Sequence, residues 1–143
     1  MIHRLARYSL AASLSLALAF PALASNADDE AEARLALLNA HAGESVDRVT
    51  FLRSIDSYEV VGKHNLLLWE TPSKAWLVDL RESPACRHLE RDYMIGIDTF
   101  TDSINTRNSY IVGRGGLSCR VDRLREVDVV AWRTAERVAG IRE

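Results

Sequence analysis

The chain has little of what cofactor-binding and metal-binding sequences usually contain. It has only two cysteines and four histidines, and neither type occurs at the short spacings that metal sites use. The glycine-rich run Gly113-Arg114-Gly115-Gly116 lacks the third glycine of a dinucleotide-binding motif and leads into no predicted helix. We therefore expect no metal and no cofactor.

Motifs for nucleophilic or acid–base catalysis are also missing. The nearest serine candidate is Ser118, but Arg120 stands where a nucleophile elbow requires glycine, and the segment lies in a predicted hairpin. Asp56 and Glu59 would point to opposite faces of a regular strand, which separates them as a carboxylate pair. The sequence leaves open whether the protein is an enzyme, and we lean against it.

An excess of positive charge is absent as well. The chain has 18 lysines and arginines against 20 aspartates and glutamates, a formal net charge of −2. The arginines between Arg120 and Arg137 alternate with acids, which is typical of a solvated surface. This pattern gives no electrostatic reason to expect nucleic acid or anionic lipid as a partner.

The longest apolar run lies at the N-terminus and is too short to span a membrane. A basic stretch, Met1–Tyr8, precedes the uncharged Ser9–Phe20, whereas a bilayer core needs about 20 apolar residues in a helix. Small residues then precede Ser25, as a signal peptidase requires. We predict a Sec-type signal peptide over residues 1–24, cut between Ala24 and Ser25.

Removal of this segment predicts a mature chain of residues 25–143, a length typical of one domain. The predicted location is the periplasm or the outside of the cell, with no stable membrane span after cleavage. In such an oxidising compartment, the only two cysteines, Cys86 and Cys119, predict a structural disulfide. A redox role for the pair is less favoured, because no Cys-x-x-Cys motif is present.

The periodicity predicts a mainly β (α+β) fold. Asn26–Ala42, closed by Gly43, is expected to be a helix with an apolar face, and Glu30 and Arg34 lie one turn apart on it. The predicted strands and intervening loop are then Arg53–Val61, Leu66–Glu70, Ala75–Leu80, Met94–Phe100, the loop Thr101–Asn108, Tyr110–Val112 and Leu117–Leu124. For Val127–Ala139 a helix capped by Asp128 and ended by Gly140 is favoured over a strand.

This order predicts an antiparallel meander that forms a small sandwich or a partly open barrel, with an N-terminal helix and a C-terminal helix. The inward positions of the last strand include Cys119, which suits a buried disulfide better than a reactive thiol.

A ligand surface can be suggested at only two places. Trp69 and Trp76, on adjacent predicted strands, could form a platform for sugar rings or a peptide, although core packing is the favoured role. Asp98 and Asp102 supply oxygens to one loop that could hold a weak cation, but the full calcium-loop pattern is absent.

Several short segments together resemble a known family. They are Ser54–Tyr58, Leu66–Trp69, Ala75–Val78, Cys86, and Cys119–Val121 ahead of Val127-Asp128. In this pattern the chain resembles domain of unknown function 6491, a family of small exported bacterial proteins. The resemblance implies a secreted, disulfide-linked domain with no assigned activity, and it provides no catalytic residues to transfer.

Three functional hypotheses follow. The first is a non-enzymatic periplasmic protein that binds an unknown envelope protein or ligand. The second is an envelope enzyme acting on a small or cell-wall substrate, and the third is a thiol redox protein.

Overall fold

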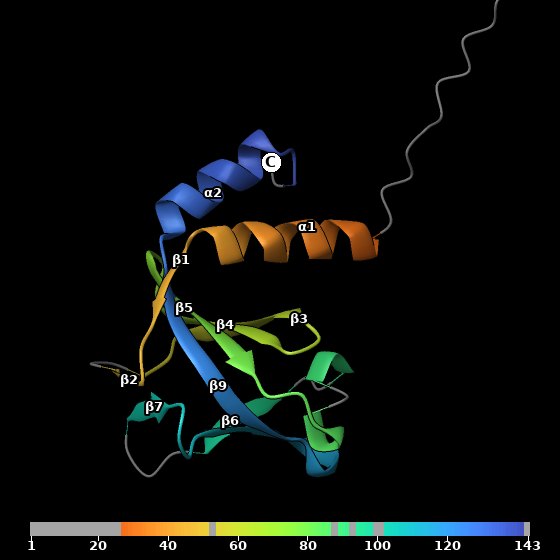
Figure 1. The fold of residues 1–143 in the computed structure, drawn as a ribbon, viewed down its shortest axis with the longest axis vertical. Helices are drawn as coiled ribbons and strands as arrows, with labels where there is room; N and C mark the ends of the chain where they lie inside the picture. Colours follow the sequence, from red (N-terminus) through yellow and green to blue (C-terminus); the bar gives the residue numbers. More distant parts are fainter. Residues whose placement is uncertain (1–26, 52–53, 87–88, 92–93, 99–101, 142–143) are drawn as a thin grey trace, which may run out of the picture.

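The computed structural model describes residues 27–51, 54–86, 89–91, 94–98 and 102–141. The predicted signal peptide and its cleavage site between Ala24 and Ser25 lie outside these residues. Helices α1 (Ala27–Ala40) and α2 (Val129–Val138) lie together at one end of the molecule, and strands form the rest (Figure 1). Within the described residues, no helix is long and apolar enough to cross a membrane.

The main sheet is antiparallel and curls into a half-barrel. Its order is β3-β4-β5-β9-β8-β6, with β1 also paired to β9, while β2 and β7 form a separate ribbon. The strands are β1 (Ala42–Ser45), β2 (Arg48–Thr50), β3 (Ser57–Gly62), β4 (Asn65–Thr71), β5 (Lys74–Leu80), β6 (Ile95–Asp98), β7 (Ser103–Asn105), β8 (Tyr110–Gly113) and β9 (Ser118–Val127). Short 3-10 turns are η1 (Pro84–Cys86), η2 (Leu89–Arg91) and η3 (Arg114–Gly116). The mainly β prediction is confirmed, and of the two predicted forms it is the partly open barrel.

Strand β9 joins the parts of the curled sheet. It is 10 residues long, and β5 pairs along most of one side of it, from Val127 to Val121. On its other side β8 pairs with the beginning of the strand and β1 with its end. The β5 pairing shifts register between Asp79 and Leu80, and such irregularities increase the local twist and bend of a strand.

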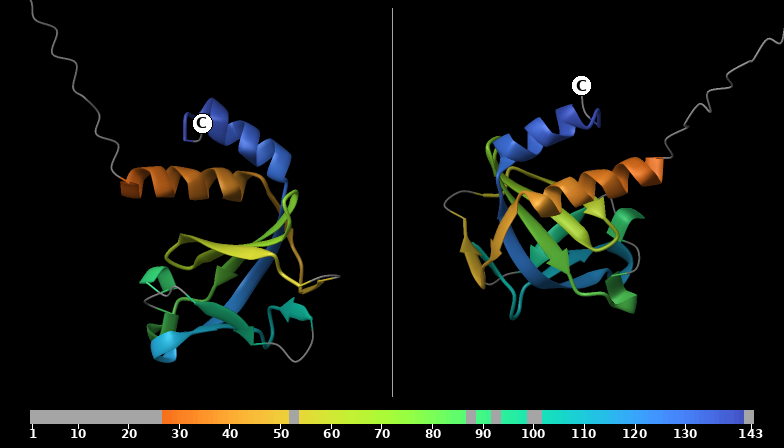
Figure 2. Two further views of the ribbon diagram at one scale, coloured as in Figure 1. Left: turned by 180° about the vertical axis from the view of Figure 1, so that it is seen from behind. Right: turned by 45° about the horizontal axis from the view of Figure 1, so that its top comes forward.

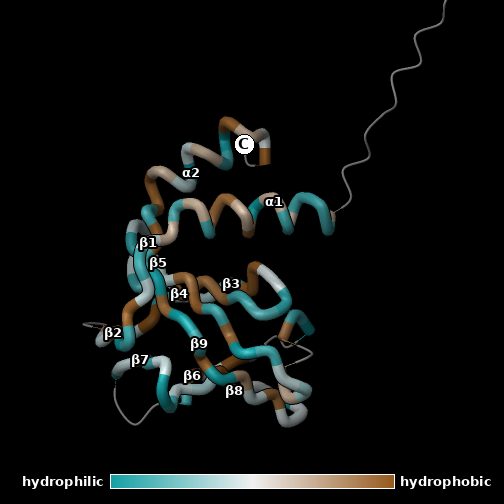
Figure 3. Tube along the Cα trace, viewed as in Figure 1, coloured by the Kyte–Doolittle hydropathy of each residue, from teal (hydrophilic) through white to brown (hydrophobic). Residues whose placement is uncertain are grey.

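The two faces of the sheet carry two separate hydrophobic cores, because β4 and β5 are apolar on both sides. On β4, Leu66 and Leu68 belong to the inner core of the half-barrel, whereas Leu67 packs toward the helices. The ribbon of β2 and β7 covers the inner core with Val49 and Ile104. In Figure 3, brown apolar segments and teal polar segments alternate along the strands.

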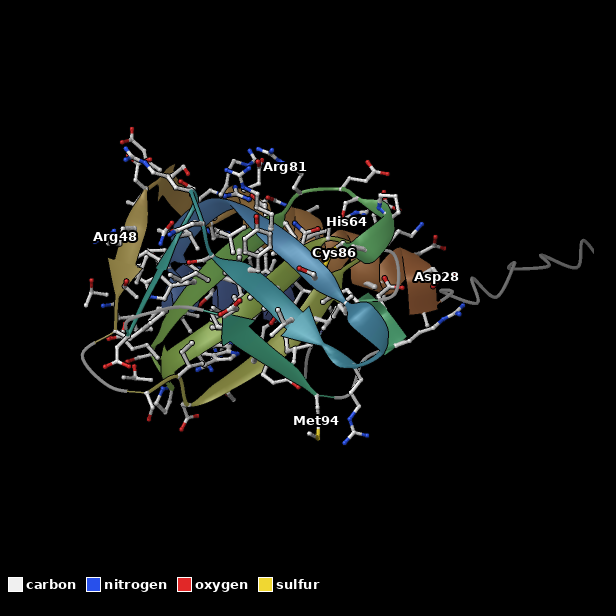
Figure 4. The ribbon with its side chains drawn as sticks, turned by 90° about the horizontal axis from the view of Figure 1, so that it is seen from below. Asp28, Arg48, His64, Arg81, Cys86 and Met94 are labelled. Atoms are coloured by element: carbon white, nitrogen blue, oxygen red, sulfur yellow. A yellow bond between two sulfur atoms is a disulfide. The ribbon has the colours of Figure 1, made fainter. Side chains whose placement is uncertain are left out.

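The predicted disulfide joins Cys86 of η1 to Cys119 of β9, across a sequence separation of 33 residues. Both residues are fully buried in the inner core. Seen from below in Figure 4, Cys86 lies near the middle of the molecule, whereas Asp28, Arg48 and Met94 lie at its periphery. The bridge therefore ties the connection after β5 to the central strand β9.

The C-terminal helix and the β8–β9 turn agree with the sequence. The side chain of Asp128 accepts a hydrogen bond from the backbone N–H of Ala131 (3.0 Å), which caps α2. Gly140 follows the helix with φ 71°, and Gly115 has φ 66° in the turn. These are left-handed conformations that glycine adopts without strain.

Other predicted boundaries were wrong. The first helix ends at Ala40 and not at the predicted Ala42, because Ala42–Ser45 pairs with β9. The strand predicted from Arg53 begins only at Ser57. The predicted loop Thr101–Asn108 contains β7, whose partner β2 lies far away in the sequence, so local patterning could not reveal it.

Candidate functional site

A cleft of about 590 Å³ lies where α1 and α2 meet the outer part of the sheet. Helix α1 contributes Glu30 and Arg34, and helix α2 contributes Arg133 and Glu136. The rest of the wall comes from the segment entering β3 and from β4 and its turn. Figure 2 shows both helices on the same side of β3 and β4. The cleft is thus built from segments far apart in the sequence.

Arg34 connects the elements around the cleft. Its Nε donates to Oε1 of Glu136 (2.8 Å), and its two terminal nitrogens donate to the two carboxylate oxygens of Glu59. The Glu136 side chain is about 1% exposed, whereas those of Arg34 and Glu59 are 25% and 40% exposed. A forked arginine–carboxylate pair is directional as well as strong, so this cluster fixes α1 against both β3 and α2.

The pKa of Arg34 is raised well above its usual value. Its hydrogen bonds to Glu59 are the largest cause, and burial opposes them, while Glu136 adds a further increase. A raised pKa in the folded state means that this stabilisation is complete below the unfolded pKa and is lost only as the pH rises through the folded value. Arg34 therefore stays charged throughout the physiological range.

Two tryptophans and two arginines stack beside the ion pairs. The guanidinium of Arg34 lies 5.3 Å from the Trp132 ring centre, and that of Arg133 lies 5.2 Å from the Trp69 ring centre. The two rings are 6.1 Å apart and tilted by 37°. Each cation–π contact contributes about 0.5–2 kcal/mol. Trp132 is fully buried, so the stack fastens α2 to β4 and leaves Trp69 at the cleft wall.

The remaining charged groups of the cleft are not neutralised in this way. Within the part of the chain that the structure describes, Glu30 and Asp56 form no ion pair. Arg133 likewise forms no ion pair or side-chain hydrogen bond with a described residue, and its buried Nε has no acceptor there. The cleft thus holds one stacked guanidinium and two carboxylates whose charges are available to a ligand.

The structure separates the two tryptophans that the sequence placed on adjacent strands. Trp69 pairs with Ala75 and lies on the helix-covered face, whereas Trp76 pairs with Leu68 and belongs to the inner core. Trp76 is 8% exposed, and its indole N–H donates to Glu70 (3.4 Å). They do not form a shared platform, and only Trp69 lines the cleft.

Asp98 and Asp102 are exposed on either side of residues 99–101, which are not among the described residues. Neither aspartate lines the cleft. Across the described ranges, no group of three or more histidines, cysteines or acids is placed to hold a metal ion.

The sequence-based prediction that Asp56 and Glu59 lie on one regular strand was wrong. A regular strand through both residues would place them on opposite faces, but β3 begins at Ser57, and both acids line the cleft. Glu30 and Arg34 lie one turn apart on α1, as the sequence indicates, but Arg34 forms its ion pairs with Glu59 and Glu136.

Glu136 was missed, although the sequence contains a signal for it. Val129, Trp132 and Glu136 are the buried residues of α2, and their spacing places them on one helix face. A charged residue on an otherwise apolar face requires a buried partner. One such partner is Arg34, which lies 102 positions away in the sequence, so the sequence could indicate that Glu136 needs a partner but could not identify Arg34.

The fold and this cleft define a small, mainly β protein in which two helices cap one face of a half-barrel sheet. The chain belongs to the Family of unknown function (DUF6491), whose model matches residues 5–143. The resemblance found in the sequence is thereby confirmed. No curated protein and no solved structure shows a significant match to the chain.

Proposed function

We propose that this protein is exported to the bacterial envelope and acts there as a non-enzymatic binding protein, with the cleft between the helices and the sheet as its ligand site. The cleft itself is the observation that supports this proposal. Its volume of about 590 Å³ falls within the range of about 300–1,000 Å³ that is typical of small-molecule sites. Export rests on the N-terminal sequence pattern.

The construction of the wall suits binding. Arg34, Glu59 and Glu136 hold one another in place, and Trp132 and Trp69 anchor the helix to the sheet. Side chains held in this way do not have to be ordered when a ligand arrives, which lowers the entropic cost of binding. A preformed cleft with an aromatic side and available charges is what a selective binding protein needs.

An envelope enzyme acting on a small or cell-wall substrate is the second candidate, because the cleft gathers Asp56, Glu59 and Glu136. Carboxylates can serve as general acids or bases. Two of these three, however, accept hydrogen bonds from Arg34, so oxygens of both carboxylates are already engaged within the wall of the cleft. This arrangement ranks catalysis below binding.

A thiol redox role is third. Cys86 and Cys119 are fully buried in the inner core, and thiol–disulfide exchange requires access for the attacking thiolate. The burial of the bridge supports a structural role.

The test uses protein recovered from the periplasm and measured by mass spectrometry, first intact and then under native conditions. We expect an intact mass that begins at Ser25 and a non-covalent small ligand on the wild-type protein. In a Ser57→Trp variant the large side chain should fill the cleft, since Ser57 is an exposed residue of its wall and bulk there excludes a ligand. The ligand should then be lost.

Ser45→Trp is the matched control, because Ser45 is also an exposed serine on a strand and does not line the cleft. This variant should retain the ligand. Equal loading of both variants would refute the cleft as the site, and an intact Met1 would refute export.

A further inference from the structure

Arg133 is the feature of the cleft that points to a particular ligand chemistry. Its guanidinium stacks on Trp69 at 5.2 Å, and the side chain has no carboxylate or carbonyl partner among the described residues. A guanidinium that lies on an aromatic ring keeps the donors at its edge directed outward in a planar fork. That fork matches the two oxygens of a carboxylate.

The acidic residues of the cleft restrict which ligands could bind to the Arg133 guanidinium. Glu30 and Asp56 share the cleft with Arg133 and have no described ion-pair partner. A ligand with negative charge alone would gain one arginine but approach two carboxylates that have no described ion-pair partner, and such like-charge contacts disfavour binding. A ligand with positive charge alone would leave the Arg133 fork unused. A ligand that carries both charges uses all three groups.

The uncharged part of the cleft wall also restricts the kind of ligand that fits. Trp69, Pro72 and Ile141 supply apolar surface, which favours a ligand with an aliphatic or aromatic portion. Ser57 lies opposite Trp69 in the β3–β4 pairing and lines the same cleft, so its hydroxyl is available for one hydrogen bond.

We propose that the cleft binds a zwitterion with an apolar side chain, namely an α-amino acid or a short peptide. The ligand carboxylate lies on the Arg133 fork, its ammonium group faces Asp56 and Glu30, and its side chain packs against Trp69, Pro72 and Ile141. This inference rests on the proposed function, because it names the ligand class of the same site.

The experiment is titration calorimetry of the mature protein with matched probes. L-Leucine and L-alanyl-L-leucine carry both charges, their N-acetyl forms keep only the carboxylate, and their amides keep only the ammonium group. We expect at least one free zwitterion to bind, and both of its blocked forms to bind at least tenfold more weakly. A tenfold loss corresponds to about 1.4 kcal/mol.

Variants assign the two charges to residues. Arg133→Gln should weaken the zwitterion at least tenfold and leave the amide unaffected, and Asp56→Asn should weaken it while sparing the N-acetyl form. Arg133→Lys, which keeps the charge but not the fork, should fall between Arg133→Gln and wild type. Arg137→Gln is the control, since Arg137 is exposed on the same helix outside the cleft. Thermal unfolding verifies that each variant is folded.

The outcomes separate this inference from the proposed function. Blocked probes that bind as well as the zwitterions would overturn the ligand class while leaving the cleft as a binding site. Failure of every probe, together with a native ligand that Ser57→Trp removes, would also overturn the ligand class alone. Failure of every probe, with no difference between Ser57→Trp and Ser45→Trp, would overturn both.

Discussion

At the scale of single residues, the Arg34–Glu136 pair joins α1 to α2 through a fully buried carboxylate. Glu136 is fully buried, and removing a charged partner from a buried carboxylate is destabilising, by about 3–5 kcal/mol where the pairing is lost completely. We expect Arg34→Met to lower the free energy of unfolding by about 3 kcal/mol, toward the lower end because Arg34 is partly exposed. Urea-induced unfolding followed by tryptophan fluorescence measures the change.

The matched control for Arg34 is Arg81→Met. Arg34 pairs with both Glu59 and the buried Glu136. Arg81 pairs with Asp122 (3.1 Å), and their side chains are 55% and 43% exposed. Pairs of this kind contribute about 0–1 kcal/mol. If the two substitutions lowered stability equally, burial of Glu136 would not be the source of the effect.

At the scale of elements, the close approach of α1 to the β3–β4 turn depends on Gly62. A methyl group on Gly62 would lie 2.9 Å from Cδ2 of Leu35 in α1 and 2.9 Å from Oδ1 of Asn65. Both atoms are the far ends of flexible side chains that can shift, so the cost lies at the lower end of the range typical of overpacking, about 1 kcal/mol. We expect Gly62→Ala to lower the free energy of unfolding by that amount, and amide hydrogen exchange should show faster exchange in α1.

Gly96→Ala serves as the comparison, because the nearest atom to its added methyl group is Cγ2 of Val112 at 3.7 Å, an ordinary contact. This substitution should change stability by less than about 0.5 kcal/mol, as is usual for surface changes. Unchanged exchange in α1 of the Gly62→Ala protein would show that the helix is held without this contact.

At the scale of the whole molecule, the disulfide links the first half of the sheet to the second. The Cys86–Cys119 bridge closes a loop with a sequence separation of 33 residues, which on the chain-entropy model stabilises the fold by about 3–4 kcal/mol. Reduction followed by alkylation should lower the unfolding free energy by about this amount. The measurement is urea unfolding of the oxidised and the reduced, alkylated protein.

Intact mass verifies the state of each sample, since two alkyl groups should be added only after reduction. Equal stability of the two forms would mean that packing of the inner core alone determines the fold, and the bridge would then need another explanation.

The sequence by itself determined the local architecture of this protein. The meander β3–β5 follows from short runs rich in apolar, β-branched and aromatic residues between turns, and α2 follows from a cap at Asp128 and a stop at Gly140. The bridge follows from the presence of only two cysteines. The strands and the helix depend on signals within a few residues, and two cysteines allow only one disulfide pairing. None of these predictions therefore requires knowledge of which distant segments are neighbours.

Only the tertiary structure decided where the cleft lies and which side chains form it. Arg34, Glu59 and Glu136 come from three elements, and Trp69 and Trp76 are separated because neighbouring strands present opposite faces at these positions. The pairings of β2 with β7 and of β1 with β9 likewise join distant segments. Such contacts depend on how the sheet curls and how the helices cross it, and these are properties of the packed chain and not of any local stretch of its sequence.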